Sequence, residues 1–155
     1  MDELDAAITR IMQTDGRTTN RELAAELGVA PSTTLERLRR LRESGVITGV
    51  HAEVDLATLN RPVEAIIAVK LRPQTRAVIH GFRNFVINLP ETLACYITAG
   101  DDDVLIHVAV QGTQQLQDFV LDRLTKHKEI ASVTTSMIYE HVRNHVVAPL
   151  PRIAT

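Results

Sequence analysis

The sequence has little of several residue types that define special classes of protein. Its 155 residues include one cysteine, no tryptophan, two tyrosines and three phenylalanines. A single thiol cannot form an internal disulfide or supply a four-thiolate zinc centre, and it fits a reducing compartment such as the cytoplasm. So few aromatic rings argue against the stacking platforms that bind single-stranded nucleic acid.

Long apolar runs and a basic overall charge are also missing. No run approaches the ~20 residues that cross a bilayer, and the first residues do not have the pattern of a signal peptide. The net charge is −2, and the first fifty residues hold seven basic and eight acidic side chains. Any affinity for DNA must therefore come from a local basic stripe. The 45% hydrophobic content is normal for a folded chain.

Helical periodicity and helix caps dominate the first fifty residues. A first helix begins after Asp2 and ends near Gly16, where we expect positive φ. Thr19 and Glu22 form a capping box that opens a second helix, which stops at Gly28. The apolar stripes of these two helices consist of Leu4, Ile8, Ile11 and Met12, and of Leu23, Ala24 and Leu27.

A third helix follows a tight turn, which is the pattern of a helix-turn-helix motif. Pro31 suits its first turn, Leu35, Leu38 and Leu41 are expected to be its buried stripe, and Gly45 closes it. Such a motif lays its last helix in the DNA major groove. The predicted DNA-contacting residues are Thr33, Glu36, Arg37 and Arg40, flanked by Ser32 and Arg39. The alternative is a solvated helix face with a Glu36–Arg40 ion pair.

The rest of the chain predicts an α+β domain. Val46–Val54 is expected to be a strand, and residues 57–62 a connector in which Asn60 can take a left-handed conformation. The later elements are strands at 64–71, 92–98, 104–110 and 131–140 and helices at 76–89 and 114–127, the second capped by Thr113. Their order, β-α-β-β-α-β, is that of a ferredoxin-like fold.

These elements define a two-domain organisation. The predicted parts are a helix-turn-helix, winged-helix-like domain at 1–48, a strand and linker at 49–62, a ferredoxin-like domain at 63–147 and a mobile tail at 148–155. In the strand at 64–71, Ile66, Ile67, Ala68 and Val69 are consecutive, so both faces of that strand are apolar. Since ferredoxin-like sheets carry helices on one face, we expect a second subunit to cover the other.

Several short motifs together resemble the leucine-responsive regulator/AsnC (Lrp/AsnC) family of prokaryotic transcription factors. They are Asp15-Gly16-Arg17, Glu22-Leu23-Ala24, Leu27-Gly28, Arg37, Leu41 and Gly45-Val46-Ile47 in the head, and Gly100-Asp101-x-Asp103 in a loop. The resemblance spans essentially the whole chain. It implies a homodimer, often assembled into tetramers or octamers, that binds double-stranded DNA. It also implies a small-molecule effector, commonly an amino acid, that binds between dimers.

The resemblance also implies which residues bind the effector. They are Thr98, Gly100, Asp101, Asp102 and Asp103, with Thr135 and Met137 on the last strand. The alternative for the three aspartates is a solvated turn. The chain departs from the family pattern at Ala30, where a capping serine is usual, and Ser32 could take over that role. Val50, Asn60 and Asp102 replace a common tyrosine, a common glycine and a frequent aromatic residue.

Two other classes of function remain open. A siroheme-decarboxylase-like enzyme would line a cavity with histidines and arginines, but the six histidines are scattered. His141 and His145 have metal-ligand spacing only on a helix, and we expect a strand or tail there. Cys95 has no nearby base and predicts an inert buried thiol. We therefore expect no catalytic, metal or cofactor site. A nucleoid-type architectural DNA-binding protein is the second alternative.

Overall fold

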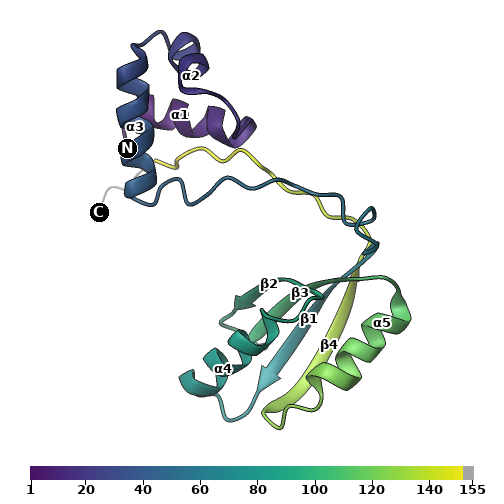
Figure 1. Ribbon diagram of the computed structural model, residues 1–155. Coiled ribbons are helices and arrows are strands. Elements are labelled where there is room, and N and C mark those ends of the chain that lie inside the picture. The colour runs from purple at the N-terminus through teal and green to yellow at the C-terminus, as the bar shows by residue number, and fades with distance from the viewer. Residues whose placement is uncertain (152–155) are drawn as a thin grey trace. The chain divides into compact units, whose positions relative to one another are not determined.

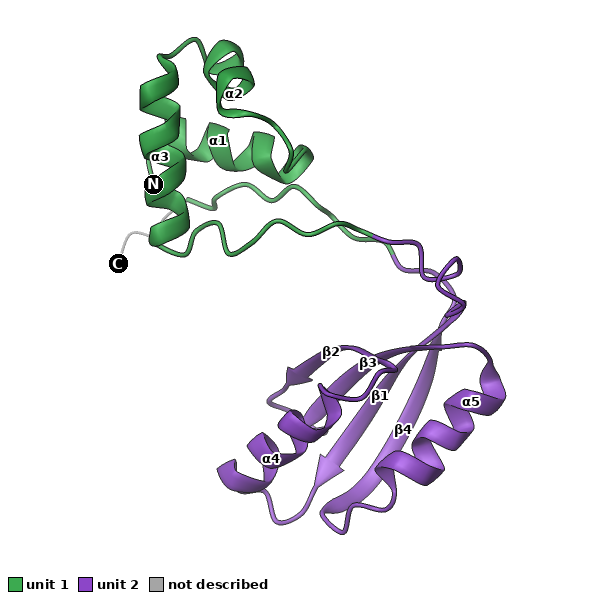
Figure 2. Cartoon of the chain, in the orientation of Figure 1, with its two compact units in different colours: residues 1–53, 142–155 green, residues 54–141 purple. Residues whose placement is uncertain are grey.

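The computed structural model describes residues 1–151, which form two compact units. The first unit combines Met1–Glu53 with the C-terminal segment that begins at Val142, and the second is Val54–His141 (Figure 2). The predicted domain boundaries stay a prediction. The C-terminal segment lies in the first unit, although the sequence pattern placed residues 142–147 with the sheet.

The first unit contains the three predicted helices, α1 (Glu3–Thr14), α2 (Asn20–Leu27) and α3 (Pro31–Glu43). Asp2 caps α1, and Thr19 and Glu22 form the predicted capping box on α2. Gly28 ends α2 with φ of 66°, a left-handed conformation that costs glycine little. The tight turn of the helix-turn-helix is therefore confirmed. The core of this unit consists of Ile8, Ile11, Met12, Leu23, Leu38 and Leu41.

The buried stripe of α3 differs from the predicted one. Thr34 is fully buried, whereas Leu35 is 60% exposed. The Thr34 hydroxyl can be buried because it donates to the carbonyl of Pro31 at 3.0 Å. Residues 34, 38 and 41 follow the i, i+4, i+7 spacing of a helix face, so this stripe is as regular as the predicted one. Packing against α1 and α2 decides between the two.

Two further predictions for this unit are wrong. Residues 46–54 contain no strand, and a strand needs a partner for its backbone hydrogen bonds. Helix α1 ends at Thr14, close to the predicted position, and the N–H of its C-cap Asp15 donates to the carbonyl of Ile11, but Gly16 is not among the residues with positive φ. The structure favours glycine at position 16 for lack of space, because an added Cβ would lie 2.5 Å from a methyl group of Val50.

The second unit is a four-stranded antiparallel sheet with its helices on one side (Figure 1). The strands are β1 (Val63–Leu71), β2 (Thr92–Ile97), β3 (Val104–Val110) and β4 (Ile130–Ile138), in the order β2-β3-β1-β4. Helix α4 (Arg76–Val86) links β1 to β2, and α5 (Thr113–Asp118) continues into the π-helix η1 (Phe119–Leu124) before β4. The predicted β-α-β-β-α-β order is confirmed.

Small differences concern the helix ends. Helix α4 stops three residues before the predicted end at 89, and the predicted helix at 114–127 ends at Leu124 as a π-helix. Gly112 is the N-cap of α5, and no side chain caps this helix. The prediction that Thr113 is the cap is therefore wrong. Asn60 has φ of 60°, as expected for a left-handed turn in the connector.

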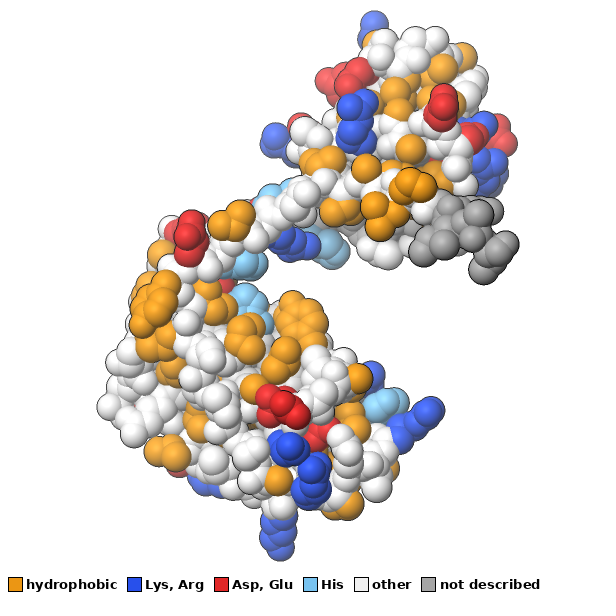
Figure 3. Space-filling view, turned by 180° about the vertical axis from the view of Figure 1, so that it is seen from behind, with side chains coloured by type: hydrophobic (Ala, Val, Ile, Leu, Met, Phe, Trp, Pro, Cys, Tyr) orange, Lys and Arg blue, Asp and Glu red, His pale blue; other side chains and the backbone are white. Residues whose placement is uncertain are grey.

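The two faces of the sheet bury different amounts of surface. Ala65, Ile67, Val69 and Leu71 point toward the helices and are fully buried. The alternate residues of β1 and their register partners form the open face, where Ile66, Ala68 and Leu105 are only half-buried. Figure 3 shows the side of the molecule away from the view of Figure 1, where hydrophobic side chains of this unit lie among polar and charged ones. The centre of the open face is therefore apolar, as the sequence predicted, but Glu64, Lys70 and His107 lie on the same face, with Glu64 and His107 2.8 Å apart.

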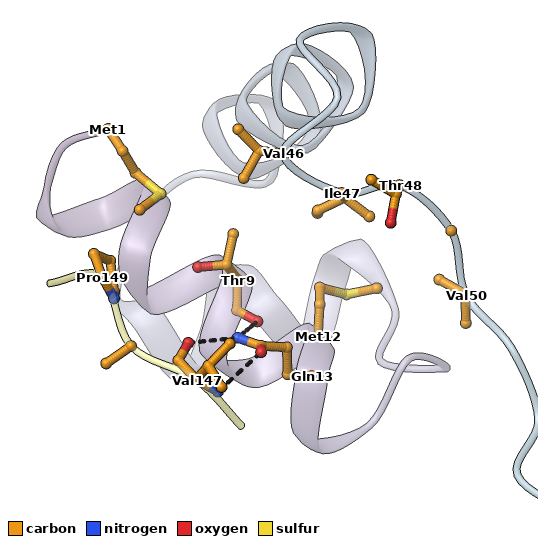
Figure 4. Close-up of a pocket in the computed structure, with 12 residues that line it drawn as sticks. Met1, Thr9, Met12, Gln13, Val46, Ile47, Thr48, Val50, Val147 and Pro149 are labelled. Carbon is orange, nitrogen blue, oxygen red and sulfur yellow. Dashed lines mark hydrogen bonds between the residues drawn. The ribbon is translucent and has the colours of Figure 1, made fainter. Parts of the chain in front are cut away.

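The C-terminal segment is bound to α1 rather than free. The side-chain amide of Gln13 donates to the carbonyl of Val147 at 3.1 Å, and the N–H of Val147 donates to the Gln13 side chain at 3.0 Å (Figure 4). Ala148 and Pro149 line a mainly apolar cavity of about 400 Å³ between α1 and residues 46–50. The mobility of the tail from residue 148 onward stays a prediction, and residues 152–155 lie outside the described part.

Candidate nucleic-acid interface and effector loop

The outer face of α3 carries most of the residues predicted to contact DNA. Ser32, Glu36 and Arg39 are exposed, and Thr33 is half-buried beside them. The Arg39 side chain is 70% exposed and lies 3.6 Å from Glu43 one turn later. A helix face of hydroxyl, carboxylate and guanidinium groups can reach both base edges and phosphates. Leu35 borders this face, although its helical spacing with Leu38 and Leu41 predicted a position in the core.

Arg37 and Arg40 differ from the other predicted residues because both contact Asp5 of α1. Arg37 donates to Asp2 and, at 3.1 Å, to Asp5, and its side chain is only 27% exposed. Arg40 donates to Asp5 at 3.3 Å, so it contacts Asp5 instead of Glu36. Hydrogen bonds to Asp2 and then Asp5 raise the pKa of Arg37. Both arginines therefore hold α3 against α1.

The N-terminus of α3 has no side-chain cap. Ala30 is its N-cap, and the N–H groups of Thr33 and Thr34 donate to the Ala30 carbonyl at 2.9 and 3.3 Å. Ser32 therefore does not take over the capping role that its position suggested. Its exposed hydroxyl stays on the outer face of α3.

The predicted effector loop connects β2 to β3 and is closed by its own hydrogen bonds. The Thr98 hydroxyl donates to the carbonyl of Asp102 at 2.6 Å, and its N–H donates to the carbonyl of Asp103 at 3.0 Å. Gly100 has φ of 154°, a conformation that favours glycine. Asp101 is exposed and Asp102 half-buried. The loop thus presents the side chains of Asp101 and Asp102, whereas the Thr98 hydroxyl is already engaged.

Asp103 has a different role from its neighbours in the loop. It is 3% exposed, and its carboxylate accepts from the N–H of Leu71 at 2.7 Å and from the side-chain amide of Gln74. The Leu71 bond is the main reason that the pKa of Asp103 lies below its usual range, with a smaller contribution from Arg72. Asp103 therefore joins the loop to the end of β1 and is not open to a ligand.

Thr135 and Met137 do not lie beside this loop within one chain. They are exposed residues of β4, which forms one edge of the sheet, whereas β2 forms the other edge. Along the sheet, Thr135 pairs with Ile67, and Met137 pairs with Ala65 near the far end of β1. A single chain therefore brings Thr98, Gly100, Asp101, Asp102 and Asp103 together and leaves Thr135 and Met137 apart.

Other residues considered as chemical groups have structural surroundings. Cys95 packs against the helix-covered core, and burial raises the pKa of its thiol, as expected for an inert cysteine. Residues 139–151 contain no helix, so His141 and His145 do not share a helix face. Within residues 1–151, no three His, Cys, Asp or Glu side chains are placed to hold a metal ion. No helix in this range has the length and hydropathy to span a bilayer.

Comparison with known proteins identifies both units. Residues 64–147 match the family model described as "Lrp/AsnC ligand binding domain", and residues 1–48 match "Winged helix-turn-helix DNA-binding". The chain belongs to the Lrp/AsnC family. The family comparison and the fold agree with a transcriptional regulator that has a DNA-binding head and a ligand-binding domain.

Individual relatives match over nearly the full length. The transcriptional regulator AldR of Mycolicibacterium smegmatis is 36% identical, covering 92% of this chain and 84% of AldR. The leucine-responsive regulatory protein of Rhizobium meliloti is 31% identical, covering 93% of this chain and 92% of that protein. The solved regulator of Neisseria meningitidis in complex with L-Met has a TM-score of 0.86 at 27% identity, with 97% and 96% of the two chains covered. These similarities favour a regulator over the alternative interpretations.

Proposed function

We propose that this Lrp/AsnC-family regulator reads specific DNA sites with the outer face of α3 and that an amino acid controls this binding. The observation that carries the DNA part is the exposed row of Ser32, Glu36 and Arg39, with Thr33 and Leu35 beside it. Arginine recognises guanine with two hydrogen bonds, and an apolar side chain can contact the thymine methyl group. Leu35 therefore adds an apolar contact to the polar contacts of the predicted residues.

Arg37 and Arg40 contribute to DNA binding in a second way. Both are bound to Asp5, so they fix the orientation of α3 on α1 as well as adding positive charge. A phosphate near these guanidinium groups would use their remaining N–H donors without breaking the contact with Asp5. We place them at the phosphate backbone and Arg39 at the base edges.

The effector part rests on the loop between β2 and β3. Asp101 and Asp102 offer carboxylates to the ammonium group of an amino acid, and a related regulator was solved with L-Met, which supports this ligand class. Thr135 and Met137 belong to the opposite edge of the sheet. They can complete the site only from a neighbouring subunit, so the site forms between copies of the chain.

Association of subunits rests on the open face of the sheet. Ile66, Ala68 and Leu105 lie in the middle of this face, and no helix of the described chain packs on it. Packing two such faces together would bury them, which is the usual driving force for a homodimer. We propose a dimer built this way, with further association through the effector loops, and a non-enzymatic protein that works in the cytoplasm.

Genomic DNA selection with the purified full-length protein tests this function. At about 150 mM salt, weak binding through phosphates alone is suppressed. We expect a small set of fragments that share a palindromic half-site pattern, with half-sites about 34–36 Å apart or a multiple of this. Broad recovery without a shared pattern would contradict sequence-specific regulation and favour an architectural protein.

The effector is tested on a recovered fragment. Each of the common amino acids is added to the complex, and DNA affinity is measured for the wild type and for the double variant Asp101→Asn, Asp102→Asn. We expect one amino acid to change the affinity of the wild type and to have a weaker effect on the variant. An equal response of both proteins would remove this loop from the effector site.

A further inference from the structure

A second cavity, lined mainly by polar groups, lies in the second unit, away from the effector loop. It has a volume of about 210 Å³ and lies between the turn before β1, the start of β2 and the end of β3. Val63 pairs with Val110 at this end of the sheet, whereas Val69 pairs with Val104 beside the effector loop. Six residues of strand separate the two places, which is roughly 20 Å. The cavity is therefore a separate location.

One carboxylate and one guanidinium line this cavity without forming an ion pair with each other. Glu91 lines the cavity, but its Oε2 has almost no solvent-accessible surface in this conformation and accepts no hydrogen bond from the described residues, so a ligand reaches this oxygen only if the side chain turns toward the cavity. Arg61 donates to the neutral carbonyl of Pro90 at 2.6 Å, which leaves the other donors of its guanidinium group. A buried carboxylate oxygen without a donor costs free energy unless water or a ligand supplies one.

The remaining polar groups of the cavity are neutral amides. Asn60 and Gln115 both line it, and the side-chain oxygen of Gln115 accepts from the N–H of Gln111 at 2.7 Å. This bond leaves the NH₂ group of Gln115 as a donor. With a single carboxylate, the cavity does not supply the several oxygen ligands that a divalent cation needs.

These groups match the chemistry of a small zwitterion. We propose that this cavity is a second ligand site, in which Glu91 binds the ammonium group of a free amino acid and Arg61 binds its carboxylate. The volume is below the range of about 300–1,000 Å³ for drug-sized ligands, so only a small amino acid fits. Charge-assisted hydrogen bonds at both ends make the site selective for molecules that carry both charges.

Ligand binding here acts on the turn that precedes β1. The turn is closed by the N–H of Arg61, which donates to Leu56 at 2.8 Å, and by the N–H of Thr58, which donates to Asp55 at 2.7 Å. It follows directly after the boundary between the two units at residues 53 and 54. A ligand that links Arg61 to Glu91 ties this turn to the start of β2.

Equilibrium dialysis of the full-length protein tests the proposal. The probes are radiolabelled glycine, L-alanine and L-methionine, and each is measured with the wild type, with Glu91→Gln and with the effector-loop variant Asp101→Asn, Asp102→Asn. We expect Glu91→Gln to weaken binding of at least one probe by about tenfold or more, while the loop variant keeps that binding. Glu140→Gln is the matched control, because it removes the same charge from an exposed residue.

Competition experiments separate this site from non-specific binding. Propionate lacks the ammonium group of alanine and ethylamine lacks its carboxylate, so neither should displace labelled L-alanine. Binding that Glu91→Gln leaves unchanged but the loop variant abolishes would overturn the inference and leave the proposed effector site intact. The reverse result for a probe would assign the binding of that probe to this cavity, and the effector loop is then tested separately by the DNA-affinity experiment. Failure of all three probes to bind would also overturn the inference.

Discussion

Asp5 in the first unit and Asp103 in the second are both nearly buried, but different kinds of group surround them. Asp5 contacts two arginines, Arg37 and Arg40, which belong to the helix that we assign to DNA. Asp103 accepts mainly from a backbone N–H and a side-chain amide, with Arg72 at 3.9 Å. The acid in the head is thus coupled to the DNA-binding helix, whereas the acid in the sheet unit stabilises a loop.

This difference has a consequence for regulation. A charge near α3, such as a DNA phosphate, acts on the same arginines that hold α3 to α1, so binding and local stability are linked in the head. In the sheet unit, neutral partners hold Asp103, and the neighbouring Asp101 and Asp102 stay available.

The largest effect is expected from Asp103→Ala. The change leaves the N–H of Leu71 and the amide of Gln74 without their acceptor in a buried place, so the second unit should lose about 3 kcal/mol of unfolding free energy. Urea denaturation measures this loss of unfolding free energy, and hydrogen exchange of the β1 amides locates it in the second unit. The exposed neighbour Asp101→Ala is the control, and an equal loss in both variants would contradict the structural role of Asp103.

Arginine substitutions on α3 should have the next largest effect. Arg39→Ala is expected to weaken DNA binding about tenfold and to leave the melting temperature unchanged, because Arg39 contacts only exposed Glu43. Arg37→Ala should lower the DNA affinity and reduce the slope of log affinity against log salt concentration by about 1. It should also lower the stability of the head, because Asp5 loses a partner. Fluorescence anisotropy over a salt series and thermal melting give both quantities. Identical effects of the two changes would end the distinction between them.

Acid should affect the sheet unit through Asp103. Its pKa in the folded protein is lowered from 3.8, so its ionised form contributes stability above that pH, and the contribution is lost as the pH falls through the folded pKa. The urea midpoint of the wild type should therefore fall more steeply below about pH 4 than that of Asp103→Asn, which cannot ionise. Parallel curves for the two proteins would show that this carboxyl does not contribute.

The smallest effect is expected at the C-terminal segment. Gln13→Ala removes both hydrogen bonds to Val147, and each contributes only about 1 kcal/mol or less at an exposed position. Trypsin should then cleave after Arg143 a few times faster, because the segment beyond it leaves α1 more often. Gln114→Ala, whose side chain bonds only to Asp118 in α5, is the control. No change in cleavage rate would mean that the cavity contacts alone hold the segment.

The caps of α1, α2 and α4 and the order of helices and strands along the chain were predictable because they depend on local chemistry, whereas the caps suggested for α3 and α5 were wrong. Thr19 and Glu22 have the residue types and the spacing of a capping box, which marks the start of α2. Gly28 ends this helix because glycine can adopt positive φ. The consecutive apolar residues Ile66 to Val69 likewise predicted a strand with apolar side chains on both faces, of which the structure buries one. The same reasoning located α3 and the β2–β3 loop, so the elements that carry the candidate sites were predictable.

The side chains that complete those sites were not predictable, because contacts across the chain decide them. Thr34 and Leu35 both lie on regular helical stripes, and only packing on α1 and α2 buries Thr34 and exposes Leu35. The strand predicted at 46–54 is absent because no described segment pairs with it.

The family resemblance, the order of the helices and strands, and the loop and helix that carry the candidate sites could all be predicted from the sequence. Those features follow from caps, glycines and periodicity within short stretches of chain. Only the tertiary structure decided which charges are engaged. Asp5 lies 32 and 35 residues from its partners Arg37 and Arg40, and Asp103 lies 32 residues from Leu71. It also placed Arg61 and Glu91 on one cavity. Electrostatic partners depend on distance in space, which local sequence pattern does not encode.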